Sequence, residues 1–425
     1  MLTVAKICNH WLEKGQTARL MDINKSLQPI PVSLTLLRVA NALTFSEVGQ
    51  RMKATFRVFA VLMAIAVMGC GSGGFNPTPI GFVYVVGQGA NSVQGFTQKS
   101  DGEITALSVS SINTSPRPVS MAFTPSKNFI YVANLTTNVV SGYTVDHTTG
   151  VLTPVGEALP PSPVGIQPIS VGVDPSGHFL YVLNQGNATA NTSSISVFSI
   201  DTTRGILTPI AGSPFSVPAS PQYMLVSPAS EVVYVVSGSP STISVFGIAA
   251  NGGLAAATAS NFTGPVNANI TSIAVDPKGL FMYATDLGNG NVISLSIAAG
   301  SSALTPVAGS PFTAGTGPNA VAVDGTGAFV YVSNNGSNDV SAFKSTSGVL
   351  AQITGSPFTT EGPGTVAATA PGFLTVDSTS TFLYVANTAT SGVAAFLLNP
   401  DGTLGTVVNS PFGQAISPVW IVATK

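Results

Sequence analysis

The chain alternates between short apolar runs and polar turns, and residues 168–210 show the pattern most clearly. Ile169-Ser-Val-Gly-Val173 has an apolar side chain at every second position, which is the period of a strand. Phe179-Leu-Tyr-Val-Leu183 is a continuous apolar run, as expected of a strand covered on both faces. The pattern predicts four strands in this unit, at residues 169–173, 179–183, 194–200 and 206–210.

Turn-forming residues separate these strands. In Asp174-Pro-Ser-Gly177 the Asp side chain can bond to the backbone, Pro presets φ, and Gly accepts a positive φ. Other units carry Asp276, Asp324 and Asp377 at the same point. We therefore interpret these carboxylates as turn formers rather than as acid–base groups.

The unit recurs seven times along the chain. Its most regular mark is a tyrosine in the second strand, which we interpret as a core residue. The seven copies are Tyr84, Tyr131, Tyr181, Tyr234, Tyr283, Tyr331 and Tyr384, spaced 47 to 53 residues apart. Repeats of about 20–50 residues indicate solenoids, propellers or arrays, and four antiparallel strands per repeat form the blade of a propeller. We therefore expect an all-β fold, a seven-bladed β-propeller.

The two ends of the repeat region predict how the ring closes. Phe82-Val-Tyr-Val85 is second-strand sequence without a first strand before it, and Pro418-Val-Trp-Ile-Val-Ala423 is first-strand sequence without a second strand after it. Pairing of these N- and C-terminal strands would complete one blade and remove two free sheet edges. An open solenoid would instead need polar caps at its ends, and the sequence shows none.

Composition narrows the choice of partners. Residues 1–69 carry eight Lys/Arg against three Asp/Glu, whereas residues 70–425 carry seven against fourteen. A nucleic-acid interface needs a basic stripe to neutralise phosphates, so we expect no nucleic-acid partner. Cys8 and Cys70 are the only cysteines, among three histidines and no CxxC or HExxH motif. We therefore expect no metal site and no cofactor.

We divide the chain into four parts, at residues 1–51, 52–69, 70–80 and 81–425. Met52–Arg57 is basic and precedes twelve uncharged, mostly apolar residues, which is typical of a secretory signal peptide. This run is too short to cross a membrane as a helix, which takes about 20 residues. Residues 1–51 are either a genuine extension or lie upstream of the true start at Met52.

The end of the apolar run suggests an anchor. Val67-Met-Gly-Cys70 resembles the lipobox of bacterial lipoproteins. That resemblance implies that Cys70 is acylated and attaches the protein to a membrane in the bacterial cell envelope, outside the cytoplasm. The alternative is a buried strand that ends in a chance Gly-Cys pair. Residues 70–80 are rich in Gly and Pro and would form a tether to the propeller.

The second strands carry a family likeness. Tyr131-Val-Ala-Asn134, Tyr331-Val-Ser-Asn334 and Tyr384-Val-Ala-Asn387 resemble the YVTN-type repeat. Together with the Asp-Pro-x-Gly turns and the Gly-x-Leu-Thr-Pro outer strands, they are similar to the seven-bladed lactonase family, which includes bacterial 6-phosphogluconolactonase. The resemblance covers residues 80–425 and implies a propeller that hydrolyses lactones.

The family's catalytic residues are not found at the matching positions. In the lactonase pattern one first strand begins Gly-Pro-Arg-His-Met, and the most similar segment here is Ser220-Pro-Gln-Tyr-Met224. Gln222 and Tyr223 thus stand where the family has Arg and His, and Gly238 stands where it has Glu. A further His corresponds to Val119 or Ile169. Because lactone opening needs a base and a group that stabilises the oxyanion, we assign no catalytic residue.

The first strands still offer a candidate ligand site at the channel mouth. Two residues after their common start, period-two geometry places Tyr223, Phe373 and Trp420 on one face of three different strands. Gln222 and Asn319 flank these rings, and Arg117 is the cation next to a first-strand start. Aromatic faces with amides suit sugars or other neutral ligands. The alternatives are that the rings merely plug the channel and that Arg117 is solvated.

We therefore expect a monomeric, lipid-anchored propeller that binds a glycan, small molecule or protein without catalysis. The alternative is a lactone hydrolase of the 6-phosphogluconolactonase type with a divergent site.

Overall fold

The computed structural model describes residues 79–156, 165–187, 192–229, 231–238, 241–257, 261–360, 369–413 and 417–424. The predicted extension, signal peptide and Cys70 lie outside the described residues, as does the tether up to residue 78. No helix in the described part is long and apolar enough to cross a membrane.

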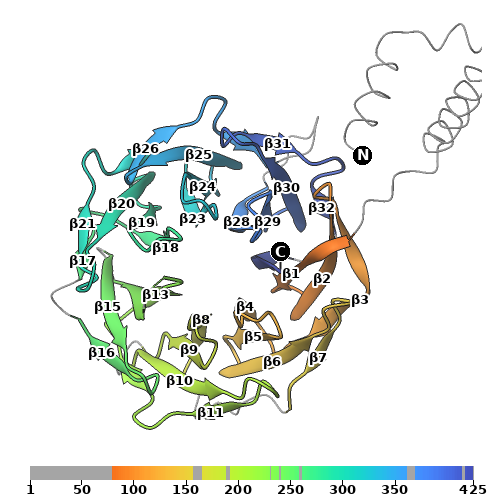
Figure 1. Cartoon of the computed structure of the whole chain (residues 1–425), viewed down its shortest axis with the longest axis vertical. Helices are drawn as coiled ribbons and strands as arrows, with labels where there is room; N and C mark the ends of the chain where they lie inside the picture. Colours follow the sequence, from red (N-terminus) through yellow and green to blue (C-terminus); the bar gives the residue numbers. More distant parts are fainter. Residues whose placement is uncertain are drawn as a thin grey trace, which may run out of the picture. The chain divides into compact units, whose positions relative to one another are not determined.

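The described strands form seven antiparallel sheets, arranged as blades around a central space (Figure 1). The innermost strands are β4 (Pro118–Phe123), β8 (Pro168–Val173), β13 (Pro221–Val226), β18 (Ile270–Val275), β23 (Pro318–Val323), β28 (Pro371–Val376) and β33 (Pro418–Ala423). The second strands are β5 (Phe129–Asn134), β9 (Phe179–Asn184), β14 (Val232–Ser237), β19 (Phe281–Asp286), β24 (Phe329–Asn334), β29 (Phe382–Asn387) and β1 (Pro79–Gly87). The seven-bladed all-β propeller is thus confirmed.

Two further layers complete each blade. The third strands are β6 (Val139–Val145), β10 (Ser194–Ile200), β15 (Thr242–Ile248), β20 (Asn291–Ile297), β25 (Asp339–Thr346), β30 (Gly392–Leu398) and β2 (Ser92–Lys99). The fourth strands are β7 (Leu152–Pro154), β11 (Leu207–Pro209), β16 (Leu254–Ala256), β21 (Leu304–Pro306), β26 (Val349–Gln352), β31 (Leu404–Thr406) and β3 (Ile104–Asn113). We number the blade of β33, β1, β2 and β3 as blade 1, and the others follow in chain order from blade 2 (β4–β7) to blade 7 (β28–β32).

Blade 1 closes the ring as the sequence predicted. The C-terminal strand β33 pairs with β1, and Val83 lies opposite Ala423 while Val86 lies opposite Trp420. The Phe82 N–H also donates to the Thr424 hydroxyl at 2.8 Å. Because β33 pairs along the inner edge of β1, the closure leaves β1 without a free edge, and an open solenoid is excluded.

The outer layer differs from the predicted single strand. In blades 3 to 7 a fifth strand of two residues pairs with the third strand beside the fourth. These strands are β12 (Phe215–Ser216), β17 (Phe262–Thr263), β22 (Phe312–Thr313), β27 (Phe358–Thr359) and β32 (Phe412–Gly413). Where the two outer strands part, the Val197 N–H donates to the Ser213 hydroxyl at 2.9 Å. The same bond recurs at Ser310, Ser356 and Ser410. It explains the Ser-Pro-Phe sequence that these blades share, because the serine hydroxyl accepts the backbone N–H at the break in the ladder.

In the described part of the chain, five of the seven second-strand tyrosines donate a hydrogen bond to a glycine carbonyl of the next blade. All seven are fully buried, which confirms that they are core residues. Tyr131 of blade 2 donates its hydroxyl hydrogen to the Gly205 carbonyl of blade 3 at 2.8 Å, and Tyr384 of blade 7 donates to Gly102 of blade 1 at 3.3 Å. The same contact therefore continues across the closure.

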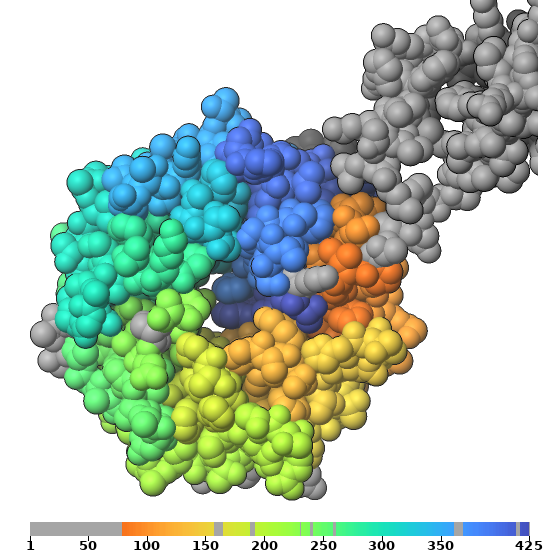
Figure 2. All heavy atoms as spheres, in the orientation of Figure 1, coloured from red at the N-terminus to blue at the C-terminus, as the bar shows by residue number. Residues whose placement is uncertain are grey.

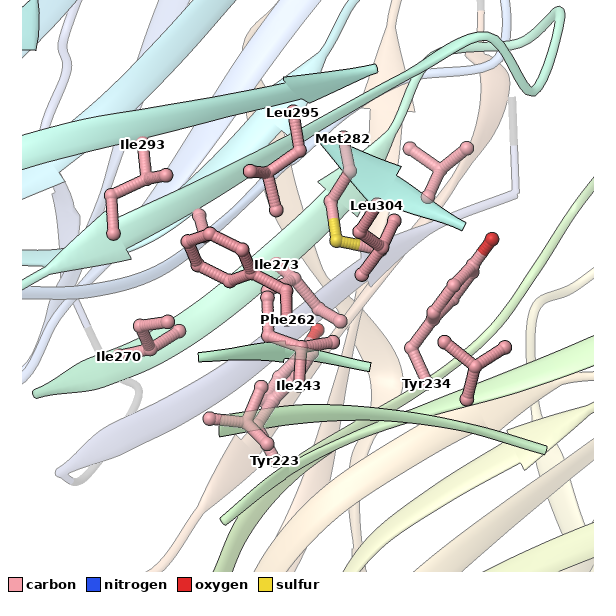
Figure 3. Close-up of a cluster of buried hydrophobic side chains, with 14 residues drawn as sticks. Tyr223, Tyr234, Ile243, Phe262, Ile270, Ile273, Met282, Ile293, Leu295 and Leu304 are labelled. Carbon is pink, nitrogen blue, oxygen red and sulfur yellow. The ribbon is translucent and has the colours of Figure 1, made fainter. Parts of the chain in front are cut away.

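Apolar side chains fill the spaces between blades. The cluster between blades 4 and 5 combines Tyr234 and Ile243 of one blade with Ile273 and Met282 of the other (Figure 3). Burial of each such side chain contributes about 1.5–3 kcal/mol. Packing of these side chains therefore stabilises the contact between neighbouring blades.

The turn aspartates are confirmed as structural. The Asp174 carboxylate accepts the Phe179 N–H at 2.7 Å, and Asp324 accepts the Phe329 N–H at 2.8 Å. Asp276 and Asp377 accept the corresponding N–H groups of the next strand. Each carboxylate thus fixes the turn between the first and second strands of its blade.

Candidate functional site

The seven inner strands start at the same end of the ring, and most begin with a bulge. In β13 Pro221 pairs with Ser237 and Tyr223 pairs with Val236, so Gln222 is left out of the register. In β23 Asn319 is left out in the same way. A bulge re-aims the extra side chain, and Gln222 is exposed while Asn319 is half-buried.

Three aromatic rings meet across the central space. Phe373 of β28 stacks on Trp420 of β33, with ring centroids 3.8 Å apart and planes at 13°. Tyr223 of β13 lies on Trp420 as well, at 6.1 Å and 25°. Because β13 and β33 lie on opposite sides of the channel (Figure 1), the stack spans it. Figure 2 shows a hollow at the centre of the ring, with atoms of the C-terminal segment in dark blue within it.

Of the three rings, Tyr223 is buried, whereas Trp420 and Phe373 are half-buried. The Trp420 Nε1 is buried and has no hydrogen-bond partner in the described structure. Burial raises the pKa of the Tyr223 phenol to about 12, an effect that the neighbouring Ser272 hydroxyl opposes. Tyr223 is therefore a neutral hydrogen-bonding group at physiological pH, and not a base.

The small residues that share the register of the three rings do not line an open face. Ser120 and Ser170 are buried, and each bonds to the next blade. The Val171 N–H donates to the Ser120 hydroxyl at 3.2 Å, and the Ser170 hydroxyl donates to the Met224 carbonyl at 3.3 Å. The shared face predicted from the period is thus used for contacts between inner strands.

The remaining two candidates lie at the same end of the ring. Arg117 precedes β4, has a φ of 59° and is exposed, while its N–H donates to Asn91 Oδ1 at 2.8 Å. Asn319 contributes its backbone carbonyl to blade 5, where the Thr271 hydroxyl donates to it at 2.8 Å. The structure therefore brings Tyr223, Phe373 and Trp420 into contact and places Arg117, Gln222 and Asn319 on the same rim.

The sequence of the whole propeller matches one protein family. The family model described as "Lactonase, 7-bladed beta-propeller" covers residues 78–168 and 162–418. The chain belongs to this lactonase family. No curated protein matches the chain.

Solved structures show how this lactonase-family propeller compares with others. A candidate 6-phosphogluconolactonase from Bacteroides uniformis has a TM-score of 0.67 at 18% identity, covering 82% of this chain and 100% of that one. The periplasmic gluconolactonase PpgL of Pseudomonas aeruginosa has a TM-score of 0.66 at 17% identity, covering 81% and 99%. A structural-genomics target from Lactobacillus plantarum has a TM-score of 0.65 at 18% identity, covering 82% and 100%. At these identities the likeness shows the fold alone.

The structure also shows polar groups that the sequence reasoning did not single out. Asp286 ends β19 where most blades of this lactonase-family propeller have Asn, and it is fully buried. Its carboxylate accepts the N–H groups of Asn269 and Asn289 at 2.9 and 3.3 Å, and the Asn289 Nδ2 at 2.7 Å. The signal was the change from Tyr-x-x-Asn to Tyr283-Ala-Thr-Asp286. These bonds hold the adjoining loops and engage both carboxylate oxygens.

Proposed function

We propose that this lactonase-family protein is a lipid-anchored, extracytoplasmic binding module whose ligand lies at the channel mouth beside the aromatic stack. The observation that carries the proposal is the state of Tyr223. It stands where the lactonase pattern has a catalytic histidine, but its phenol is enclosed against Trp420 and has a pKa of about 12. A group that stays neutral at physiological pH supplies hydrogen bonds and apolar surface rather than base catalysis.

Other groups at this end of the ring support binding over hydrolysis. The Asp286 carboxylate is buried and accepts three N–H hydrogens of its own loops. To act as a base toward water it would have to give up bonds that hold the loops. Gln222 is exposed and offers both a donor and an acceptor.

The ligand that fits this rim is neutral and rich in hydroxyl groups. Gln222 and Asn319 supply amide donors and acceptors, and the partly exposed ring of Phe373 supplies apolar surface. One face of Phe373 is covered by Trp420. A sugar would therefore contact the free part of Phe373 and bond to the amides.

Lactone hydrolysis is the second candidate function. The family match favours it, because the family is described by that activity. The structurally similar protein from P. aeruginosa is named a gluconolactonase. In this alternative Gln222 and Tyr223 would donate hydrogen bonds to the oxyanion, and water would be activated by a group that the family pattern does not identify.

A pH-stat assay with sugar and aliphatic lactones distinguishes the two functions. The binding proposal expects acid release at the uncatalysed rate from the purified protein and from the Gln222→Ala and Tyr223→Phe variants. Acid release above that rate, lost in either variant, would establish the hydrolase. Binding is then measured with sugars through Trp420 fluorescence in a Trp11→Phe background, since these are the two tryptophans of the chain. Saturable quenching that Gln222→Ala weakens supports the rim site, and no response to any sugar contradicts it.

The anchor is tested separately through Cys70. Replacing Cys70 by Ala should release the protein from the membrane fraction of a bacterial host. Cys8→Ala is the matched control, because it removes the other cysteine of the chain and should leave the distribution unchanged. Continued membrane retention of Cys70→Ala would refute the lipid anchor.

A further inference from the structure

A residue in the left-handed conformation precedes the inner strand in six blades of the described structure. These residues are Arg117, Gln167, Ser220, Gly317, Ala370 and Ser417, with φ values between 45° and 67°. At Gln167 two backbone bonds hold this conformation. Its N–H donates to Asn138 Oδ1 of blade 2 at 2.7 Å, and its carbonyl accepts the Gln185 N–H of blade 3 at 2.9 Å. The conformation therefore ties the start of the inner strand to the preceding blade.

Glycine can serve this position without a side chain. Gly317 of blade 6 has a φ of 67°, and its carbonyl accepts the Asn335 N–H at 2.8 Å. Glycine adopts a positive φ without steric cost, whereas other residues do not. The fold therefore does not require a side chain here, yet Gln167 carries a long one that is exposed. Its amide is available for contacts with a ligand.

The aromatic stack forms the floor of the channel mouth between two of the inner strands. Tyr223 and Trp420 stack across the channel with ring centroids 6.1 Å apart. Because the inner strands start at the mouth, Gln222 and Val419 each lie one residue nearer the mouth than these rings. Both residues are left out of the register with the second strand. Since β13 and β33 lie on opposite sides of the ring (Figure 1), Gln222 and Val419 stand on opposite sides of this floor.

The two sides of the mouth differ in chemistry. On the side of the neighbouring blades 3 and 4, the exposed residues carry amides and a hydroxyl, namely Gln167, Ser220 and Gln222. On the side of blades 7 and 1, the half-buried residues are mostly apolar, namely Ala370, Phe373, Val419 and Trp420, with Ser417 beside them. A ligand that spans the mouth would therefore meet hydrogen-bonding groups at one end and apolar surface at the other.

We propose that the channel mouth binds a glycoside with an uncharged, apolar substituent rather than a free sugar. This inference rests on the sugar binding proposed above and adds the ligand class and Gln167 as a contact. The sugar hydroxyls bond to the amides of Gln167 and Gln222, and the substituent lies on Val419 and the free part of Phe373. A free sugar would turn hydroxyl groups toward Val419, where they would lose water without gaining a partner. An apolar substituent at the same place gains free energy by leaving water.

Isothermal titration calorimetry of the purified protein tests the ligand class. The probes are matched methyl and hexyl glycosides of glucose and of galactose, with 1-hexanol as the probe that lacks a sugar. We expect a hexyl glycoside to bind roughly tenfold more tightly than its methyl counterpart, because burial of two of its additional methylene groups gives about that factor. We also expect it to bind more tightly than 1-hexanol.

Two variants test the two ends of the ligand. Gln167→Gly keeps the backbone conformation and should weaken both glycosides of a pair by the same factor. Its matched control is Ser347→Gly, which removes an exposed side chain at a φ of 52° from the turn between β25 and β26, at the opposite end of the ring, and should leave both affinities unchanged. Val419→Thr, with its thermal melt checked by circular dichroism, should reduce the preference for the hexyl glycoside several-fold.

The outcomes separate this inference from the function on which it rests. Equal affinity for the methyl and hexyl glycosides overturns the glycoside inference and leaves sugar binding at the mouth intact. Binding of 1-hexanol as tight as that of the hexyl glycoside also overturns it, because the amides would then contribute nothing. Unchanged binding in Gln167→Gly removes Gln167 from the site. Failure of every glycoside to bind overturns the function proposed for the mouth together with this inference.

Discussion

A methyl group added at Gly205 tests the contact that joins neighbouring blades. Gly205 of blade 3 has a φ of 73°, and its carbonyl accepts the Tyr131 hydroxyl hydrogen of blade 2. A Cβ at this position would lie 2.5 Å from Cδ1 of Phe129, also in blade 2. Gly205→Ala therefore introduces both a strained backbone conformation and a steric clash between blades.

Gly300→Ala separates the two effects. Gly300 has a φ of 79°, and no heavy atom lies within 4 Å of the position of an added Cβ. Both substitutions carry the cost of a left-handed non-glycine residue, about 1–2 kcal/mol. Only Gly205→Ala also overpacks an interface, which typically costs about 1–3 kcal/mol more. We therefore expect Gly205→Ala to be destabilised by about 1–3 kcal/mol relative to Gly300→Ala.

Urea unfolding followed by circular dichroism measures this difference directly. The free energy of unfolding should fall with urea concentration at the same slope in the wild type and the two variants. A shift in the midpoint of the transition then measures the change in stability. If both variants lose the same free energy, the Phe129 ring moves aside without cost and the contact between blades is not tightly packed. A larger loss in Gly300→Ala would contradict the reasoning altogether.

Three further outcomes follow from the structure. Trp420→Ala removes the middle ring of a partly exposed stack and should cost about 2–3 kcal/mol in urea unfolding, less than the 3–5 kcal/mol typical of a buried tryptophan; a loss below about 0.5 kcal/mol would show that the stack is not formed. Deletion of Pro418–Lys425 removes β33 from blade 1 and should abolish cooperative thermal unfolding by circular dichroism, and a near-native melt would refute closure. Burial raises the pKa of Tyr223 to about 12 and also raises that of Tyr131. In the unfolded chain, tyrosines ionise near pH 10. The free energy of unfolding is therefore at its full value below pH 10, and it falls as the pH rises above 10, because ionisation then favours the unfolded chain. Absorbance at 295 nm should then rise together with the loss of circular dichroism, and ionisation of all tyrosines near pH 10 in a folded protein would contradict this burial.

Much of the fold could be predicted because its cause is local. Alternation, turn residues and a repeated tyrosine predict blades, and unmatched strands at Phe82 and Trp420 predict the closure that β1 and β33 form. The split outer strand was missed, since its cause is a bond between the Ser213 side chain and a backbone N–H of another strand. The sequence shows that the serine recurs, but it does not show which backbone N–H the serine hydroxyl accepts.

The site was predictable only in part. Tyr223, Phe373 and Trp420 could be assigned to equivalent positions, but not to one stack, because they come from three blades and their contacts depend on ring orientation across the channel. The predicted binding roles of Arg117, Gln222 and Asn319 stay predictions.

The way in which the ring is held together limits the chemistry available at its mouth. The hydroxyl groups of Ser120, Ser170 and Thr271 form hydrogen bonds with neighbouring inner strands. A ligand could bond to them only by breaking these contacts between blades. The side chains left for a ligand are those at the second position of each inner strand, next to its first bulge. Apart from Thr271, whose hydroxyl is already bonded, those positions hold Val119, Ile169, Gln222, Asn319, Gly372 and Val419. None of these side chains ionises near neutral pH, and a general base must do so. A ligand at this rim would therefore meet amides and apolar surface, which is why binding fits the mouth better than hydrolysis.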